Sequence, residues 1–350
     1  MSTTMLDPVR SGGTPRITNG LTRRGLLTGA GAIGVLTVLP GSAWAQATGE
    51  AAPGAFPVTI EHAYGSTEIG EEPRRVVSVG YNDQDPIVAL GVIPVGVMEW
   101  YYNQPTGFFW VTERYGDTPP ETVNGADLEI NFEKVAALRP DLIVGVSGLE
   151  EDDYQTLSRI APTLAQPPGE GRYSSAPWQV SQRMIGRALG RADRAEQLIA
   201  EVEAQIAAVR EEHPEFAGSS AVVGGNEAGV IAIRGSSEVW SEFLTDLGFQ
   251  FGDIADEDYK EISEEQLELL GDLDVVVWLS EPGGIQDSPL YQGLDVALEG
   301  RDVFVDAYGE VSGTIGFNSA LSLPIAIQRL VPQLAAAIDG DPATTTEVLS

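Results

Sequence analysis

The sequence alternates short apolar strands with helical segments, and a single long amphipathic stretch interrupts this alternation. Apolar runs such as 142–146 and 275–279 are typical of strands buried on both faces of a parallel sheet. Residues 177–212 place apolar side chains at a period near 3.6, which predicts a long helical segment broken at Gly190. We therefore expect an α/β protein of two lobes, each a mostly parallel sheet flanked by helices, joined by this backbone helix.

Composition shifts and breaker residues divide the chain into six segments. They are an export signal at 1–45, a linker at 46–55, an N-terminal lobe at 56–176, an interlobe helical segment at 177–213, a C-terminal lobe at 214–340 and a tail at 341–350. We expect a hairpin around Tyr64-Gly65. Helix starts are expected at Asp85, as an N-cap before Pro86, at Asn131, and at Ser263, which opens a capped helix ending at Leu270.

The first segment has the layout of an export signal. The pair Arg23-Arg24 precedes an apolar run too short for a comfortable membrane span, and Ala43-Trp44-Ala45 supplies the small residues of a cleavage site. The sequence therefore predicts a twin-arginine signal cleaved near Ala45-Gln46, and an extracytoplasmic location in the periplasm, the cell envelope or outside the cell. An uncleaved anchor is the alternative.

Composition excludes several classes of function. The chain has 52 acidic and 20 basic residues, a net charge of −32, which opposes binding to nucleic acid or an anionic membrane surface. It has no cysteine, so disulfides, thiolate metal sites and cysteine nucleophiles are absent. Its two histidines, His62 and His213, lie far apart, and no P-loop or G-x-S-x-G motif occurs. We expect no protein-held metal, no cofactor and no enzymatic activity.

Several short segments, in a fixed order, resemble the metal-chelate-binding periplasmic proteins, the solute-binding components of ABC importers for ferric siderophores, heme and vitamin B12. The similarity extends over nearly all of residues 56–340. The segments that carry it are Pro73–Val77, Ala89–Val97, Asn131–Glu133 with Leu138–Ile143, Ile262–Leu267 and Asp274–Trp278. The resemblance implies a two-lobe periplasmic-binding-protein fold, a ferric siderophore held between the lobes, small hinge motion and a monomeric protein.

The resemblance also implies one exposed glutamate on each lobe that meets arginines of the membrane permease, which works with its ATPase. By position these are Glu133 and Glu265. Exposed carboxylates at helix starts are easily presented to a cationic partner. The alternative is that both are ordinary N-terminal acids favoured by the helix dipole.

An aromatic block follows the strand predicted at 94–97. Residues 100–110 hold six of the chain's 26 aromatic residues, and the carboxyl end of a parallel strand opens on a ligand cleft. Such a block suits a bulky, partly apolar ligand, although a local core is the alternative. By resemblance, Trp100 and Tyr259 match ligand-contact positions, and Ser147 lies at another strand end that meets ligand in the family. Tyr101 is the candidate for heme ligation.

Two arginines are candidates for charge-assisted hydrogen bonds to iron-bound hydroxamate or catecholate oxygens. Arg234 follows a strand and Arg172 lies in the interlobe loop, and the alternative for each is a surface ion pair. Tyr81, Trp278 and Tyr308 are further candidates that could equally belong to the core. The predicted ligand-binding residues are thus Trp100, Tyr101, Ser147, Arg172, Arg234, Tyr259, Trp278, Tyr81 and Tyr308.

The charge also bears on the ligand. A ferric tris-catecholate carries about three negative charges and needs a cluster of arginines, which the candidate cleft positions lack. A neutral or cationic hydroxamate or mixed chelate is therefore favoured, with the iron coordinated by the siderophore. The alternatives are heme or cobalamin in the same fold, an exported hydrolase or lyase, and a surface protein that does not transport.

Overall fold

The protein is described by a computed structural model, in which the chain divides into two compact units, Met1–Gly49 and Glu50–Ser350. The described residues all belong to the second unit. They are 56–99, 107–125, 128–169, 176–227, 230–236, 238–251, 254, 259–280, 284–341, 343–344 and 348–350, without the side chains of Glu227 and Tyr259. The predicted signal at 1–45 and linker at 46–55 lie outside them.

The N-terminal lobe begins with the predicted hairpin, β1 and β2, followed by a five-stranded parallel sheet in the order β5-β4-β3-β6-β7. Its strands are β1 (Val58–His62), β2 (Gly65–Ile69), β3 (Val76–Ser78), β4 (Gly96–Val97), β5 (Glu121–Thr122), β6 (Leu142–Val144) and β7 (Thr163–Leu164). Its helices are α1 (Gln84–Ala89), α2 (Phe109–Thr112), α3 (Phe132–Ala137) and α4 (Glu151–Leu157).

The C-terminal lobe is built on a mixed sheet in the order β11-β9-β8-β12-β13, with β10 paired to β8. Its strands are β8 (Ser220–Glu227), β9 (Val230–Arg234), β10 (Gln250–Phe251), β11 (Tyr259–Ile262), β12 (Val275–Ser280) and β13 (Asp302–Asp306). Its helices are α7 (Val239–Leu247), α8 (Asp295–Leu298), α9 (Glu310–Phe317) and α10 (Leu323–Ile338), with 3-10 turns η1 (Pro214–Phe216), η2 (Glu264–Leu270), η3 (Ile285–Asp287) and η4 (Tyr291–Gly293).

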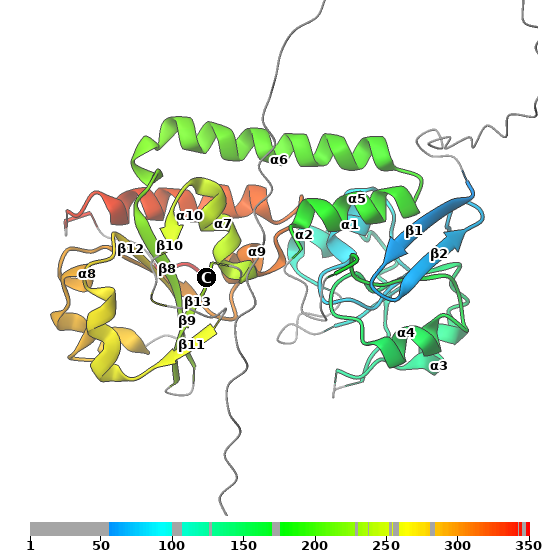
Figure 1. The fold of residues 1–350 in the computed structure, drawn as a ribbon, viewed down its shortest axis with the longest axis horizontal. Coiled ribbons are helices and arrows are strands. Elements are labelled where there is room, and N and C mark those ends of the chain that lie inside the picture. Colours follow the sequence, from blue (N-terminus) through cyan, green and yellow to red (C-terminus); the bar gives the residue numbers. More distant parts are fainter. Residues whose placement is uncertain are drawn as a thin grey trace, which may run out of the picture. The chain divides into compact units, whose positions relative to one another are not determined.

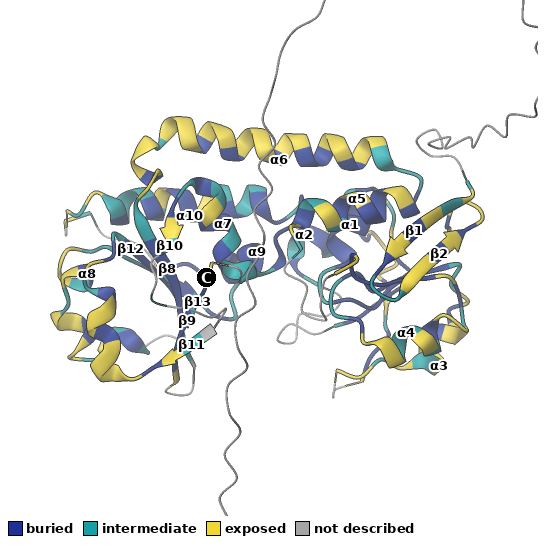
Figure 2. Cartoon of the chain, viewed as in Figure 1, coloured by how far each residue is buried: buried dark blue, intermediate teal, exposed yellow. Residues whose placement is uncertain are grey.

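The helical segment between the lobes consists of α5 (Trp178–Ala188) and the 21-residue α6 (Ala192–Glu212). The predicted break is confirmed: Gly190 has φ 67°, a left-handed conformation that favours glycine. Figure 1 shows α6 running alongside α10 and α5. Its inward face is buried and its outward face exposed (Figure 2), as expected for an amphipathic helix.

The strand cores follow the predicted burial on both faces. Val275 and Val277 join the large apolar cluster that includes α6, whereas Val276 and Trp278 join a second cluster on the opposite face of the sheet. Alternate side chains of a strand point to opposite faces, so a continuous apolar run fills both clusters. The predicted two-lobe α/β fold is confirmed.

Three local features differ from, or add to, the sequence-based expectations. β9 is antiparallel to β8 because only two residues separate them, and so short a connection forces antiparallel pairing. Asp85 is not an N-cap: α1 begins at Gln84 after Asp83, and the Asp85 carboxylate is fully buried, where it accepts hydrogen bonds from other elements. Helix α9 was not expected from its glycine-rich sequence.

No helix in the described ranges is both long enough and apolar enough to cross a membrane.

Candidate ligand-binding site

The N-terminal lobe contributes the carboxyl ends of β3 and β6, which lie side by side in the parallel sheet. Asp83 follows β3, and its buried carboxylate accepts hydrogen bonds from the Val146 amide at 2.6 Å and from Ser147 Oγ at 2.7 Å. Ser147 Oγ in turn accepts from the Asn82 amide at 3.2 Å. Burial raises the pKa of Asp83 to about 6, although these hydrogen bonds act in the opposite direction.

Tyr81 and Ser147 are thereby brought together at one sheet edge. The Tyr81 amide donates to the Ser147 carbonyl at 2.9 Å, and the Tyr81 ring lies so close to Gly148 that any Cβ there would overlap it. Both side chains are half-buried. This edge therefore presents a phenol and a hydroxyl-bearing turn whose positions Asp83 fixes.

The C-terminal lobe places Arg234 at the end of β9. Its guanidinium lies 5.3 Å from the ring centroid of Trp240, within cation–π range, and Nη1 lies 3.7 Å from Glu238 Oε2. The arginine side chain is 18% exposed, and its Nε has no hydrogen-bond partner. Arg234 is thus a largely buried cation rather than an ordinary surface ion pair.

Tyr259 lies directly opposite Arg234 in the β9–β11 ladder, so the backbones of two predicted ligand residues are adjacent. Tyr308 follows β13 and is half-buried, with its amide donating to Asp306 Oδ1 at 3.0 Å and its side chain packed against the large apolar cluster. Trp100, Tyr101 and Arg172 lie outside the described residues.

Trp278 is a core residue, and its prediction as a ligand contact is wrong. The indole is fully buried, lies on Gly224 and donates from Nε1 to the Tyr291 hydroxyl at 2.8 Å. Tyr291 donates in turn to Asp302 Oδ2 at 2.8 Å, and burial raises the pKa of both groups. The side chain points to the face of the sheet opposite the cluster that includes α6. Its partner Tyr291 lies 13 residues further along the chain, and the periodicity of the sequence does not predict this contact.

The aromatic block divides into two parts. Phe108 and Trp110 are buried and stack on each other at 4.4 Å, and Phe108 meets Phe317 edge-on at 5.2 Å. The local-core interpretation therefore holds for these two rings. Phe108 also lies against Gly313 of α9, so the end of the block is anchored to the other lobe. Phe109 is half-buried and meets Trp110 edge-on at 5.3 Å, whereas residues 100–106 lie outside the described residues.

Two hydrogen bonds join the lobes at a contact that we call the seam. In it, Asn82 and Asp85 at the start of α1 meet Phe317 and Ser319 at the end of α9. Asn82 Nδ2 donates to the Phe317 carbonyl at 2.8 Å, and Ser319 Oγ donates to Asp85 Oδ2 at 2.7 Å. A cavity of about 50 Å³ beside them is lined by both lobes and by α5. This space suits a few water molecules, whereas organic ligands occupy roughly 300–1,000 Å³. The cavity is not by itself the ligand space.

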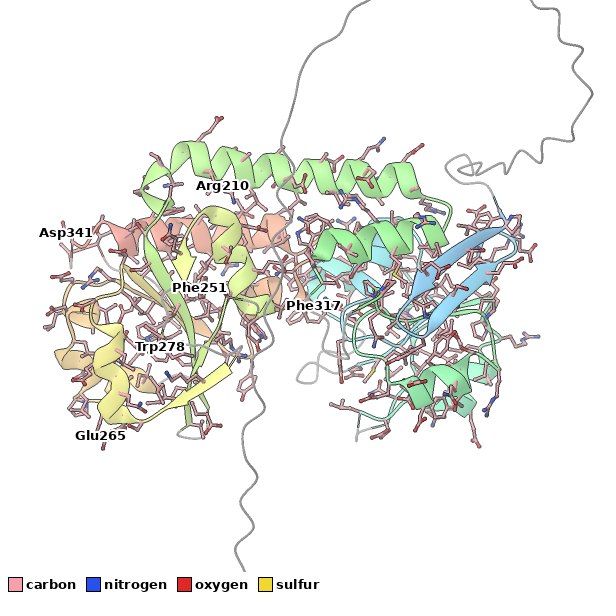
Figure 3. All side chains as sticks on the ribbon, viewed as in Figure 1. Arg210, Phe251, Glu265, Trp278, Phe317 and Asp341 are labelled. Atoms are coloured by element: carbon pink, nitrogen blue, oxygen red, sulfur yellow. The ribbon has the colours of Figure 1, made fainter. Side chains whose placement is uncertain are left out.

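The two predicted docking glutamates are exposed at element starts. Glu133 lies in the first turn of α3, which the Asn131 side chain caps by accepting from the Lys134 amide. Glu265 lies in the first turn of η2, and the capped start predicted at Ser263 is present there as a capping box with Gln266. Hydrogen bonds from its own amide and from Ser263 lower the pKa of Glu265. Figure 3 shows Glu265 at the periphery of its lobe.

The histidines have structural partners. His62 is buried in the hairpin, 3.0 Å from Thr67 Oγ1, and His213 lies 2.9 Å from Glu215 Oε1. Among the described residues no group of three or more His, Cys, Asp or Glu side chains is placed to hold a metal ion.

The chain forms two α/β lobes joined by a helical backbone. One lobe presents strand ends and a phenol, and the other presents a largely buried guanidinium. This is the architecture of a two-lobe solute-binding protein. The chain belongs to the periplasmic binding protein family, which it matches over residues 81–307.

Relatives and solved structures agree with this assignment. The Fe(3+)-citrate-binding protein YfmC of Bacillus subtilis is 27% identical over 246 residues, covering 69% of this chain and 76% of YfmC. A periplasmic solute-binding protein of Mycobacterium smegmatis superposes with a TM-score of 0.71 at 31% identity, covering 80% of this chain and 98% of that one. PiaA of Streptococcus pneumoniae in complex with ferrichrome gives a TM-score of 0.69 at 25% identity, covering 81% and 99%.

Proposed function

We propose that this protein captures a ferric siderophore between its two lobes and delivers it to the permease of an ABC importer. The observation that carries this proposal is the family match over residues 81–307, together with the likeness to a ferrichrome-bound structure over the full two-lobe fold. The protein acts as a binding module in an extracytoplasmic compartment. We propose the twin-arginine signal cleaved near Ala45 as its route of export, and a monomer as its working form.

The iron is held by the siderophore and not by protein side chains. Arg234 offers a charge-assisted hydrogen bond to an iron-bound oxygen, because its Nε has no partner and its Nη1–Glu238 contact is long at 3.7 Å. Tyr81 and the turn at Ser147 approach from the other lobe. Tyr259, Tyr308, Trp100, Tyr101 and Arg172 complete the proposed set.

A neutral or cationic chelate suits this protein better than a tris-catecholate. The full chain carries a net charge of −32, and removal of residues 1–45 would leave 16 basic and 51 acidic residues. A ligand of charge −3 would be repelled unless several arginines offset that field. Heme or cobalamin in the same cleft is the second candidate, because the family resemblance includes both ligands.

Replacement of Arg234 by Gln tests the proposed ligand contact. We expect Arg234→Gln to weaken binding of a ferric hydroxamate such as ferrichrome about tenfold, because a hydrogen bond from a charged donor contributes about 1.5 kcal/mol or more. Isothermal titration calorimetry measures this change. The matched control is Arg183→Gln, which removes the same charge from an exposed arginine paired with Glu196 at 2.9 Å. Equal affinities of the two variants would exclude Arg234 from the site.

A further inference from the structure

The short link between α9 and α10 is held by two acids from opposite lobes, Asp85, which is fully buried, and Glu242, which is half-buried. Asn318 Nδ2 donates to Glu242 Oε2 of α7 at 2.9 Å, and the next residue, Ser319, donates to Asp85 Oδ2 of α1 at 2.7 Å. Asn318 has φ 40°, an unusual conformation for a residue other than glycine. Consecutive residues of one link are therefore fixed by carboxyl groups of different lobes.

Asp85 connects three elements. Its Oδ2 accepts from Ser319 and also from Trp110 Nε1 of α2 at 2.8 Å, while its Oδ1 is buried without a hydrogen-bond partner. An ionised carboxylate with one oxygen unpaired is costly to bury. A neutral carboxyl group, whose carbonyl oxygen still accepts both hydrogen bonds, fits this position better.

Unpaired polar atoms concentrate around this link. Gln84 Oε1, Asp85 Oδ1, Ser241 Oγ and Asn318 Oδ1 are buried without hydrogen-bond partners, as are both amide atoms of Gln182. Buried polar groups in native proteins are normally paired, so each of these groups gains hydrogen bonds if water enters. The seam is therefore a contact that hydration can open.

We propose that Asp85 and Glu242 form a proton-operated clasp between the lobes, which holds the α9–α10 link when both acids are protonated and favours opening of the seam when they ionise. Ionisation creates buried negative charge close to the seam, and opening allows water to solvate that charge. The clasp acts at the seam and needs no ligand, so its test is independent of the proposed function.

The charged and titratable groups around the clasp add little compensation. Tyr115 faces Asp85, whose charge together with burial raises the tyrosine pKa, and Asp246 faces Glu242 as a like charge. Near Asp85 lie Asp83, which precedes α1, and Arg114 and Tyr115, which follow α2. Near Glu242 lies Asp246 of α7, which Arg210 and Glu203 of α6 face in turn. Arg210 lowers the pKa of Asp246, whereas the described residues that act on the two clasp acids are the neutral donors Ser319, Trp110 and Asn318 and the like charge of Asp246.

The direction of the pH effect follows from burial. Desolvation raises the pKa of Asp85 to about 7 and, with the charge of Asp246, that of Glu242 to about 7, whereas carboxyls of an unfolded chain titrate near pH ~4. The folded state thus binds these protons more tightly than the unfolded state. The stability they contribute is present in acid and is lost as the pH rises through about 7. Between pH 6 and pH 8, the loss of each of these two protons should increase the equilibrium constant for unfolding about tenfold.

Asp85→Asn separates the proton from the hydrogen bonds. The amide oxygen can accept from both Ser319 and Trp110, but the group no longer titrates. We expect the rise in the unfolding constant between pH 6 and 8, measured by urea denaturation, to be about tenfold smaller than in the wild type. The control Asn82→Ala removes the other interlobe hydrogen bond without removing a carboxyl, and should lower stability equally at both pH values. An unchanged pH dependence in Asp85→Asn would overturn the proposal.

Spin labels measure the opening of the seam directly. The chain has no cysteine, so Gln155→Cys in α4 and Glu268→Cys in η2 place one exposed label on each lobe. We expect the distance distribution from double electron–electron resonance to broaden from pH 6 to 8, and this broadening to be absent with Asp85→Asn. Ser319→Ala removes the interlobe donor and should give the broad distribution at both pH values. A wild-type distribution that does not change with pH, or equal broadening in Asp85→Asn, would contradict the clasp.

Discussion

Reversing the charge of Glu133 and Glu265 together is expected to reduce siderophore uptake at least tenfold while leaving the ligand affinity within twofold of the wild type. The two carboxylates are exposed at the starts of α3 and η2, on different lobes, and make no part of the seam or of the strand-end site. Removing one partner of a buried charge pair at an interface costs about 2–5 kcal/mol. In the docking that we propose, each glutamate meets arginines of the permease, so reversal of its charge adds repulsion. Uptake of iron-55 chelate by cells that depend on this protein measures the first quantity, and calorimetry the second.

The control carries the same change of net charge at other exposed positions. Glu68→Arg with Glu211→Arg alters β2 and α6, and should leave both uptake and affinity near wild type. A loss of ligand affinity in the Glu133→Arg, Glu265→Arg variant would mean that these glutamates belong to the ligand site. Equal loss of uptake in both double variants would indicate a general effect of charge and contradict specific docking.

Trp278→Ala should destabilise the protein by about 3–5 kcal/mol without changing the affinity for the ferric chelate. The indole is fully buried in the second apolar cluster of the C-terminal lobe, on the face of the sheet opposite α6. Its removal therefore leaves a cavity and also leaves the Tyr291 hydroxyl without its donor. Urea denaturation measures the stability, and titration under native conditions measures the affinity.

Tyr291→Phe isolates the polar part of this effect. It removes the hydroxyl that accepts from Trp278 Nε1 and donates to Asp302. We expect a loss of about 1–3 kcal/mol, because the buried indole N–H loses its acceptor and Asp302 loses one donor. A Trp278→Ala protein of normal stability that binds the chelate tenfold more weakly would restore Trp278 as a ligand contact.

The sequence predicts those parts of the fold that local chemistry determines. The break at Gly190 and the capped helix start at Ser263 each depend on residues within a few positions of one another. The buried strands were also predictable, because 275–279 is apolar on both faces. These signals sufficed to predict two lobes and the helix between them.

Features that depend on distant partners were not predictable from one sequence. Helix α9 contains Gly313 and Gly316, which weaken a helix locally, yet the Phe108 and Trp240 rings pack on these two positions and a Cβ at either would overlap them. Asp85 has the local signal of an N-cap, but its hydrogen bond to Ser319 spans 234 residues. The strand ends in the sequence therefore predict where the candidate site lies. Which aromatic residues belong to the core could be determined only from the structure.

Titration of the protein without residues 1–45, the proposed signal, against ferric chelates tests the central claim most directly. Its five tryptophans report on binding through intrinsic fluorescence. A panel of ferrichrome, ferric citrate, a ferric catecholate, heme and cobalamin should contain one ferric chelate, of neutral or positive charge, that quenches the emission at sub-micromolar concentration. Its iron-free form should bind more weakly. If no member of the panel changes the fluorescence or releases heat in calorimetry, the protein is not a siderophore-binding component of an importer.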